Sequence, residues 1–349
     1  MKLMIISIGV LALLAGCAAL IYVWPRPQDP RDRPYQVEPV RFVGGSGVTL
    51  AGELTMPRTG GPFKAIILIS GSGPQDRDET LAGHRPFLVL SDHLTRAGFA
   101  VLRYDDRGVG ESTGDFNAAT MNDFAEDAAG AFNSLRARPE IDSTAIGFLG
   151  HSEGGYIAPA AAQKVPAAFM VFLAGPAKRL LPDVMAKQTA DILRQDGKSE
   201  ATIAAARRQY ANVTRILAEQ GTVEEIRTEL DLYLREEGQT ERQRVKTLDF
   251  WANPWGIAYA TYDPIPALRA FSGPVLALFG GTDVQVSAEE NAPVMRDNLI
   301  NPRSEVIVYD GLNHLFQPSE GGSIDEYMWI NTTIDPAVLA KITRWLNSL

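Results

Sequence analysis

The chain has 349 residues, 45% hydrophobic and 21% charged, with a net charge of −9. This length and balance are typical of globular proteins with one large domain and an insertion, or with two domains, and they exclude a disordered or fibrous protein. The acidic balance argues against a nucleic acid or an anionic lipid surface as partner.

Residues 1–24 form a short positive start followed by a nearly unbroken apolar run. At about 1.5 Å per residue the run is long enough to cross a hydrocarbon core of roughly 30 Å. The letters L-A-G-C, ending at Cys17, resemble a bacterial lipoprotein signal, whereas the apolar continuation favours a retained membrane anchor; a cleaved secretory signal is the third alternative. All three predict export to the cell envelope, with the domain at the periplasmic or extracytoplasmic face, and the proline-rich residues 25–36 are predicted to be a linker. Since Cys17 is the single cysteine, the folded part is expected to contain neither a disulfide nor a thiolate metal site.

Beyond the linker, short strand patterns alternate with helical ones. The stretch V-R-F-V-G-G-S-G-V-T-L-A-G-E-L-T-M-P predicts a hairpin. Six apolar runs follow, A-I-I-L-I-S, F-A-V-L-R-Y-D, A-I-G-F-L-G, A-A-F-M-V-F-L-A, P-V-L-A-L-F-G and E-V-I-V-Y-D, mostly separated by helical patterns. Runs without alternation suit strands buried on both faces. We therefore expect an α/β fold, with a doubly wound, mostly parallel sheet built from residues 37–177 and 273–349.

One segment interrupts this alternation. Residues 178–272 are charged and helical, with a capping box in T-V-E-E from Thr222 to Glu225. The segment predicts a helical lid inserted over one end of the sheet, and an independent helical domain is the alternative.

The stretch G-H-S-E-G-G at 150–155 follows an apolar strand and precedes a helical pattern. A G-x-S-x-G turn in this position exposes a serine hydroxyl on a strained bend, because a side chain at either glycine would collide with the neighbouring strand and helix. Ser152 is therefore predicted to be a nucleophile, and the amide of Glu153 an oxyanion donor.

A serine hydroxyl needs a base and a carboxylate that orients the base. His314 follows the strand E-V-I-V-Y-D, and Asp283 follows the strand P-V-L-A-L-F-G, so both are expected at the carboxyl edge of the sheet. The chain order Ser152, Asp283, His314 is that of a hydrolase triad. Asp310 is the alternative acid, because it also follows a strand.

The remaining histidines are weaker candidates for the base. His151 is part of the elbow and is expected to point away from Ser152, His84 lies in an early loop, and His93 is expected to be a surface or satisfied helical residue.

The second oxyanion donor is expected in the loop S-G-S-G-P-Q-D-R-D. Its glycines permit close backbone approach, and the candidates are the amides of Ser72 and Gly73, since Pro74 has no N–H.

These pieces together resemble the α/β-hydrolase superfamily of serine hydrolases, in particular the bacterial carboxylesterase-like group. The resemblance rests on G-H-S-E-G, S-G-S-G-P-Q-D-R-D, Y-D-D-R-G-V-G-E-S, G-G-T-D and N-H, and covers residues from about 40 to 349. It implies hydrolysis through an acyl-enzyme without metal or organic cofactor, and a structural role for the loop that contains Asp106, Arg107 and Ser112. This chain has S-G-S-G-P where many relatives have H-G. The difference lies at Ser72, the predicted second oxyanion donor, so the resemblance supports this donor less than it supports the triad.

The expected substrate is a small-molecule carboxylic ester. The stretch W-A-N-P-W-G-I-A-Y-A-T-Y offers Trp251, Trp255 and Tyr259 as apolar substrate contacts, or else as packing within the lid. Glu153 and Asp76 would instead suit the amine of a peptide, so a serine aminopeptidase is the alternative. A tethered binding protein without catalysis is the alternative of another class.

Overall fold

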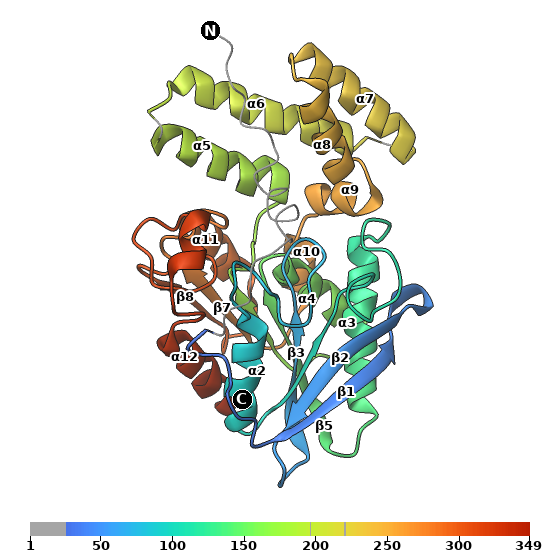
Figure 1. Cartoon of the computed structure of the whole chain (residues 1–349), viewed down its shortest axis with the longest axis vertical. Helices are drawn as coiled ribbons and strands as arrows, with labels where there is room; N and C mark the ends of the chain where they lie inside the picture. The colour runs from blue at the N-terminus through green and yellow to red at the C-terminus, as the bar shows by residue number, and fades with distance from the viewer. Residues whose placement is uncertain (1–25, 196, 220) are drawn as a thin grey trace. The chain divides into compact units, whose positions relative to one another are not determined.

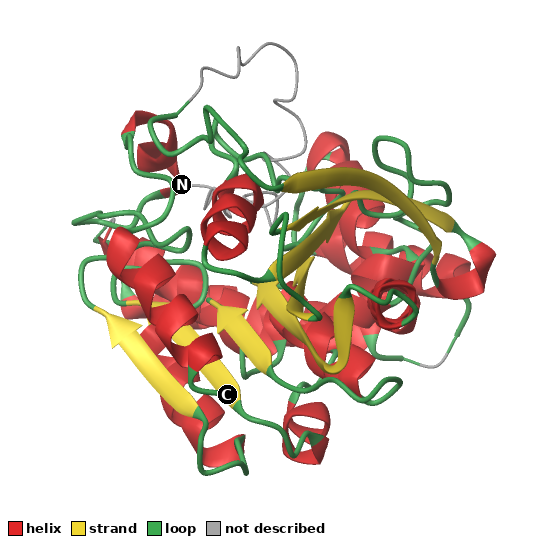
Figure 2. Cartoon of the chain, turned by 90° about the horizontal axis from the view of Figure 1, so that it is seen from below, coloured by secondary structure: helices red, strands yellow, loops and turns green. Residues whose placement is uncertain are grey.

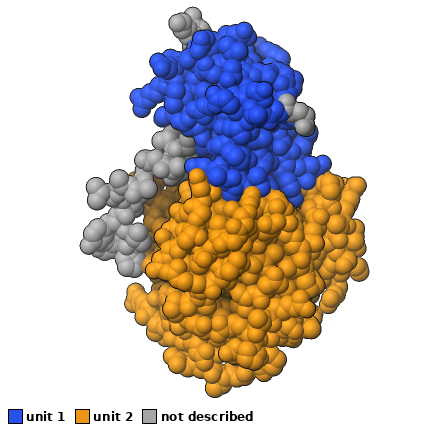
Figure 3. All heavy atoms as spheres, turned by 90° about the vertical axis from the view of Figure 1, so that its right-hand side faces the viewer, with its two compact units in different colours: residues 1–21, 117–121, 178–263 blue, residues 22–116, 122–177, 264–349 orange. Residues whose placement is uncertain are grey.

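The computed structural model describes residues 26–195, 197–219 and 221–349. It separates into two compact units, coloured individually in Figure 3. The larger unit contains the described residues up to 116 together with 122–177 and 264–349, and the smaller contains 117–121 and 178–263. The apolar run at 1–24, and with it the predicted anchor or signal, lies outside the described residues. Among those described, no helix is long and apolar enough to span a bilayer.

The larger unit is built on an eight-stranded sheet of order β1-β2-β4-β3-β5-β6-β7-β8 (Figure 1). The pairs β1/β2 and β2/β4 are antiparallel, and all the other pairs are parallel. The predicted doubly wound, mostly parallel sheet is thereby confirmed. The strands are β1 (Gln36–Val43), β2 (Thr49–Met56), β3 (Phe63–Ile69), β4 (Ala100–Tyr104), β5 (Ile141–His151), β6 (Met170–Leu173), β7 (Val275–Gly280) and β8 (Glu305–Tyr309).

Helices cover both faces of this sheet (Figure 2). On one face α2 (Pro86–Arg96) and α12 (Pro336–Asn347) share an apolar core cluster with the strands, including Leu149 of β5. The neighbouring Phe148 meets Phe132 of α3 (Met121–Arg136), with ring centroids 6.2 Å apart. Because successive strand residues point to opposite faces, α3 covers the other side. The remaining described helices of this unit are α4 (Gly154–Ala162), α10 (Ile265–Ala270), α11 (Ala288–Asn298) and the short 3-10 helices η2 (Gly45–Gly47) and η4 (Ile324–Trp329).

The smaller unit is helical, as its sequence predicts. The capping box of Thr222 with Glu225 opens α7, and a second box, Thr240 with Gln243, opens α8. The predicted insertion ends at residue 272. In the structure, Pro264–Leu349 belong to the larger unit, so the insertion ends at residue 263. The function of the helical unit as a lid stays a prediction. Its elements are the π-helix η3 (Leu180–Met185), α5 (Ala186–Gln195), α6 (Glu200–Leu217), α7 (Val223–Glu236), α8 (Glu241–Trp251) and α9 (Pro254–Thr261).

The described part of the predicted linker, from residue 26 onward, is attached to the larger unit. Arg26 donates to the carbonyls of Gly83 and Ile330 at 3.3 and 3.2 Å. Asp29 accepts from the Arg26 amide at 2.8 Å and from the Arg85 guanidinium at 2.7 Å. The prolines stiffen this segment, but these side chains hold it against the core.

Candidate active site

The nucleophile elbow joins β5 to α4. Ser152 directly follows β5 with a φ of 51°, in the left-handed region that non-glycine residues seldom adopt. Its amide donates to the Leu173 carbonyl of β6 at 2.9 Å, and its carbonyl accepts from Gly155 at 2.8 Å. The neighbouring strand and the first turn of α4 thus hold the strained bend.

The elbow glycines are required by close backbone approach. A Cβ on Gly150 would lie 2.2 Å from the Gly154 carbonyl oxygen, and one on Gly154 would lie 2.3 Å from the Ile69 carbonyl oxygen of β3. Both distances are far below van der Waals contact. A side chain at either glycine would therefore collide with its neighbours, as the sequence pattern predicts.

His314 and Asp283 come together at the carboxyl edge of the sheet, beyond β8 and β7. His314 Nδ1 lies 2.8 Å from Asp283 Oδ2, and both residues are buried. The other carboxylate oxygen, Oδ1, accepts from the amides of Gln285 and Val286 at 2.7 and 2.9 Å. The carboxylate is therefore fixed, and it can hold the imidazole in the tautomer that carries its proton on Nδ1.

Ser152 lies beside this pair, but it is not hydrogen-bonded to His314. The rings of His151 and His314 have centroids 4.8 Å apart, and Ser152 is the next residue in the elbow. Across the described part of the chain, no hydrogen bond reaches Nε2 of His314 or joins it to Ser152 Oγ. In free enzymes this contact is often long and tightens only when substrate binds.

The rival acid and the rival bases are engaged or placed elsewhere. Asp310 is exposed, whereas Asp283 is buried against the imidazole. Both ring nitrogens of buried His84 are bonded, to the Thr333 hydroxyl and the Tyr327 carbonyl, each at 2.9 Å. His93 Nε2 bonds the Thr343 hydroxyl at 2.9 Å. These contacts favour Asp283 and His314 among the alternatives.

The predicted oxyanion loop follows β3 and packs against the elbow. A Cβ on Gly71 would lie 3.3 Å from Cβ of Ser152. The Gly71 amide donates to Glu79 Oε1 at 2.6 Å. Within the described residues the amides of Ser72 and Gly73 have no such acceptor, so both remain candidates for the second donor.

The loop after β4 supports the oxyanion loop from behind. Asp106 Oδ1 lies 2.8 Å from Ser70 Oγ, and Oδ2 accepts from the Gln75 amide at 2.9 Å. Asp105 accepts from the amide and the guanidinium of Arg77. These contacts agree with the structural role that the family resemblance implies for the D-D-R-G loop, and they hold the predicted oxyanion loop in place.

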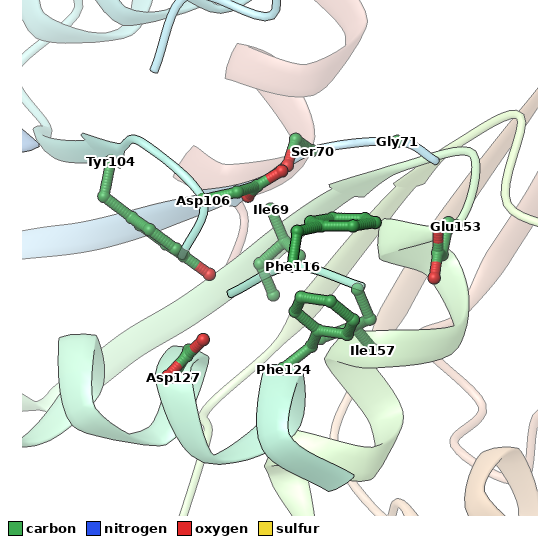
Figure 4. A pocket seen from close by; sticks show the side chains of 10 residues that line it. All are labelled: Ile69, Ser70, Gly71, Tyr104, Asp106, Phe116, Phe124, Asp127, Glu153 and Ile157. Carbon is green, nitrogen blue, oxygen red and sulfur yellow. The ribbon is translucent and has the colours of Figure 1, made fainter. Parts of the chain in front are cut away.

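A cavity opens beside Gly71 and Glu153 (Figure 4). Burial raises the pKa of Asp106 in its wall to about 8, against the hydrogen bonds from Gln75 and Ser70. The charge of Asp127 is compensated by Arg107, which donates to both carboxylate oxygens at 2.8 Å. The cavity is lined by Ile69, Ser70, Gly71, Tyr104, Asp106, Phe116, Phe124, Asp127, Glu153 and Ile157.

The predicted substrate aromatics lie in the helical unit. Trp251, Trp255 and Tyr259 are buried. The Phe250 ring meets Trp251 and Trp255 edge-on, with centroids 4.7 and 5.2 Å apart, and Tyr259 lies 5.4 Å from Trp255. This arrangement favours the packing alternative, and the substrate role stays a prediction.

Asp76, the candidate for binding a substrate amine, already has backbone partners: its Oδ1 accepts from the amides of Asp78 and Thr80.

Sequence reasoning missed one residue of the site altogether. Glu79 is buried, and its Oε1 lies 2.8 Å from Nδ1 of His151. The prediction that His151 points away from Ser152 agrees with this contact, but it does not anticipate the partner. No local pattern marks Glu79, since it stands in a charged stretch that is typical of a surface loop.

The family described as serine aminopeptidase, S33, matches residues 86–317, about two thirds of the chain. The chain belongs to this family. The matched region includes Ser152, Asp283 and His314, and it begins after Ser72 and Glu79. The fold is that of the α/β-hydrolases, and the predicted superfamily is thereby confirmed.

Individual proteins resemble this chain in sequence or in fold. Esterase EstD of Thermotoga maritima is 27% identical over 304 residues, covering 85% of this chain and 65% of that relative's length. An esterase of Pyrococcus furiosus has a similar structure, with a TM-score of 0.57 at 16% identity, covering 93% and 94% of the two chains. A thermophilic esterase of Thermogutta terrifontis matches with a TM-score of 0.52 at 24% identity, covering 89% and 98%. The two structural matches show the shared fold.

Proposed function

We propose that the protein is a serine esterase that cleaves carboxylic esters through an acyl-enzyme on Ser152. The observation that carries the proposal is the buried contact of 2.8 Å between His314 Nδ1 and Asp283 Oδ2, at the sheet edge that also presents Ser152. The curated relative EstD carries the name esterase, which supports the same reaction.

In the proposed mechanism His314 Nε2 accepts the hydroxyl proton of Ser152 as Oγ attacks the ester carbonyl carbon. The resulting oxyanion accepts hydrogen bonds from the amides of Glu153 and Ser72, and each such donor lowers the barrier by about 3 kcal/mol in comparable sites. His314 then gives its proton to the leaving alcohol as the C–O bond breaks. Water repeats the sequence on the acyl-enzyme, releases the acid and restores Ser152.

The test measures hydrolysis of p-nitrophenyl acetate, butyrate and octanoate by the wild type and by Ser152→Ala. We expect turnover in the wild type and none above background in the variant, with nearly equal unfolding temperatures. A fully active variant would remove Ser152 from the mechanism. The preference among the three acyl chains measures the size of the acyl pocket.

The family description favours a second candidate, a serine aminopeptidase. An aminoacyl p-nitroanilide separates the two, because its scissile bond is an amide beside a free amine. Labelling of Ser152 by a fluorophosphonate, together with anilide turnover and no ester turnover, would replace the esterase by the peptidase. If neither substrate turns over and no label is incorporated, the chain is a binding protein with a hydrolase fold.

We also propose that residues 1–24 tether the enzyme to the cell envelope, with the hydrolase at the periplasmic or extracytoplasmic face. The unbroken apolar run supports this placement. The full-length chain is expected in the membrane fraction, and a variant lacking residues 1–25 in the soluble fraction with its activity intact. An insoluble, inactive product would instead show that the apolar run belongs to the core.

A further inference from the structure

A second carboxylate–histidine pair lies beside the one that the mechanism uses. His151 Nδ1 is 2.8 Å from Glu79 Oε1, and His151 Nε2 is 3.2 Å from the carbonyl oxygen of His314. The same Glu79 oxygen accepts from the Gly71 amide at 2.6 Å. Both side chains are more than nine-tenths buried.

These contacts form one continuous chain across three loops. It runs from the oxyanion loop at Gly71, through Glu79 and the elbow residue His151, to the backbone of His314. Ser152 is bonded to His151 in sequence and packs against Gly71 in space. The relative positions of nucleophile, base and oxyanion loop therefore depend on this chain of hydrogen bonds.

The position of Glu79 is itself built by the loop. Its φ is 53°, in the left-handed region, and its amide donates to the Asp76 carbonyl at 2.9 Å. The Asp76 side chain caps the same turn by accepting from the amides of Asp78 and Thr80 at 3.0 Å. A strained glutamate held by its neighbours at an active site is typical of a residue with a role in that site.

The number of ring protons that these contacts need determines the charge of this pair. The Glu79 oxygen and the His314 carbonyl oxygen are both acceptors, so each nitrogen of His151 needs a proton when Glu79 is ionised. A neutral imidazole has one proton and satisfies one of the two contacts. An imidazolium facing a carboxylate satisfies both, and it leaves Glu79 Oε1 free to accept from Gly71 as well.

We infer that Glu79 and His151 form an imidazolium–carboxylate pair that positions the oxyanion loop and the His314 loop around Ser152. This role rests on the proposed esterase function. The pair is a positioning device and not a second base, because both ring nitrogens of His151 are occupied. Glu79 lies outside the part of the chain that the family matches.

The charged groups around His151 agree with an imidazolium. Glu79 approaches it from the oxyanion loop, the His314 ring and carbonyl from the loop after β8, and Asp283 from the loop after β7. The charge of Glu79 in turn helps to raise the pKa of Asp106, after β4. Burial by itself lowers the pKa of His151, but the charge and hydrogen bond of Glu79 outweigh it and raise that pKa above its ordinary value.

The isosteric variant Glu79→Gln tests the pair, because a neutral amide removes the charge that favours the imidazolium, and the single proton of a neutral His151 cannot serve both the Gln oxygen and the His314 carbonyl. If the Gln oxygen accepts from Gly71 and from a protonated Nδ1, the unprotonated Nε2 faces the His314 carbonyl oxygen; if the ring proton is on Nε2, the Gln oxygen faces an unprotonated Nδ1. If the NH2 group faces Nδ1 instead, it opposes the Gly71 amide. Loops that shift by about 1 Å in such a site cost about 100-fold in rate. We expect that loss in kcat, with KM nearly unchanged.

Asp29→Asn is the matched control. Like Glu79, Asp29 is buried and accepts both a backbone amide and a cationic side chain through one oxygen, while no described residue bonds its other oxygen. Its described hydrogen-bond partners, Arg26 and Arg85, belong to neither the elbow nor the His314 loop, so we expect lower stability and unchanged kcat per folded molecule. If Glu79→Gln keeps kcat at the level of this control, the inference is wrong.

The pH profile separates positioning from general loss of structure. In the wild type, kcat is expected to fall at alkaline pH as His151 loses the proton shared with Glu79. In Glu79→Gln the ring is neutral throughout, so this alkaline limb is expected to disappear. An identical limb in both proteins would overturn the assignment.

Nitrogen-15 NMR of labelled histidine tests the charge directly in the full-length wild type, and it does not require activity. The chain has four histidines, which keeps the spectrum assignable. We expect one ring, absent in His151→Asn, with both nitrogens protonated well above the ordinary histidine pKa. A singly protonated His151 at neutral pH would overturn the ion pair, and a spectrum as expected in a protein without ester turnover would reject the esterase alone.

Discussion

The two carboxylate–histidine pairs of this protein differ in what lies at the second ring nitrogen. In Asp283–His314 the carboxylate binds Nδ1, and no described residue bonds Nε2. In Glu79–His151 the carboxylate also binds Nδ1, but Nε2 is occupied by the His314 carbonyl. A base must accept a proton through a nitrogen that the fold leaves available. The first pair is therefore suited to catalysis and the second to positioning.

The two carboxylates differ in a related way. Asp283 has both oxygens engaged, one by His314 and the other by two amides of its own loop. Glu79 uses one oxygen for two donors, and its other oxygen has no described partner. Asp283 orients a single ring, whereas Glu79 joins the oxyanion loop to the elbow.

The largest expected effect separates the two histidines. His314→Gln removes the base, and we expect kcat to fall by about 10⁶-fold, as in a serine protease that loses its histidine. His151→Asn is expected to lose about 100-fold, because it disturbs positions only. Steady-state hydrolysis of p-nitrophenyl butyrate measures both losses. Equal losses would contradict the different roles of the two pairs.

The next effect concerns the acid. Asp283→Asn places an amide NH2 group against Nδ1 of His314, so the ring proton moves to Nε2 and that nitrogen can no longer accept from Ser152. We expect a loss of about 10⁴-fold in kcat. Asp310→Asn, at an exposed site, is expected to retain wild-type kcat. The reverse order would exchange the roles of the two aspartates.

A smaller effect is expected at the elbow that carries both His151 and Ser152. In Gly154→Ala the new Cβ would lie 2.3 Å from the Ile69 carbonyl oxygen, which costs about 1–3 kcal/mol of stability in overpacked sites. Thermal unfolding measures this loss. Gly221→Ala is the control, since its Cβ would approach only the Glu225 side chain, at 3.2 Å. Equal unfolding temperatures for the two variants would contradict the tight elbow.

The smallest effect concerns Asp106, behind the oxyanion loop. Its pKa is raised from 3.8 to about 8, so its contribution to stability is fully present below about pH 4 and is lost as pH rises through about 8. Asp106→Asn keeps a neutral group of the same shape, so its unfolding temperature is expected to fall less than that of the wild type over this range. Parallel curves from pH 4 to pH 9 would show that Asp106 carries its charge in the folded protein.

Much of the fold follows from local pattern. The apolar runs predict the strands because a strand covered by helices on both faces has no polar side. The alternation of strands and helices then favours a parallel sheet, and parallel strands bring their carboxyl ends to one edge. Ser152, Asp283 and His314 could be nominated for this reason, since each follows a strand.

Other features could not be predicted in this way. The proline-rich segment is predicted to be a linker, and this prediction does not indicate that Arg26 and Asp29 fix its described part to the larger unit. The aromatic stretch of the insertion suits either substrate contact or packing within the lid, and Trp251 and Trp255 pack on Phe250. Composition shows that a side chain can make contacts, but not which neighbours it finds.

The parallel sheet, the strained elbow at Ser152 and the order of the candidate catalytic residues could all be predicted from the sequence, because each depends on periodicity or on spacing within a few residues. Which histidine keeps a nitrogen available depends instead on contacts between distant parts of the chain. His151 meets Glu79 and the His314 carbonyl, which lie 72 and 163 positions away in the chain. Contacts at such separations arise when loops from different strands converge, and no local pattern records where those loops meet.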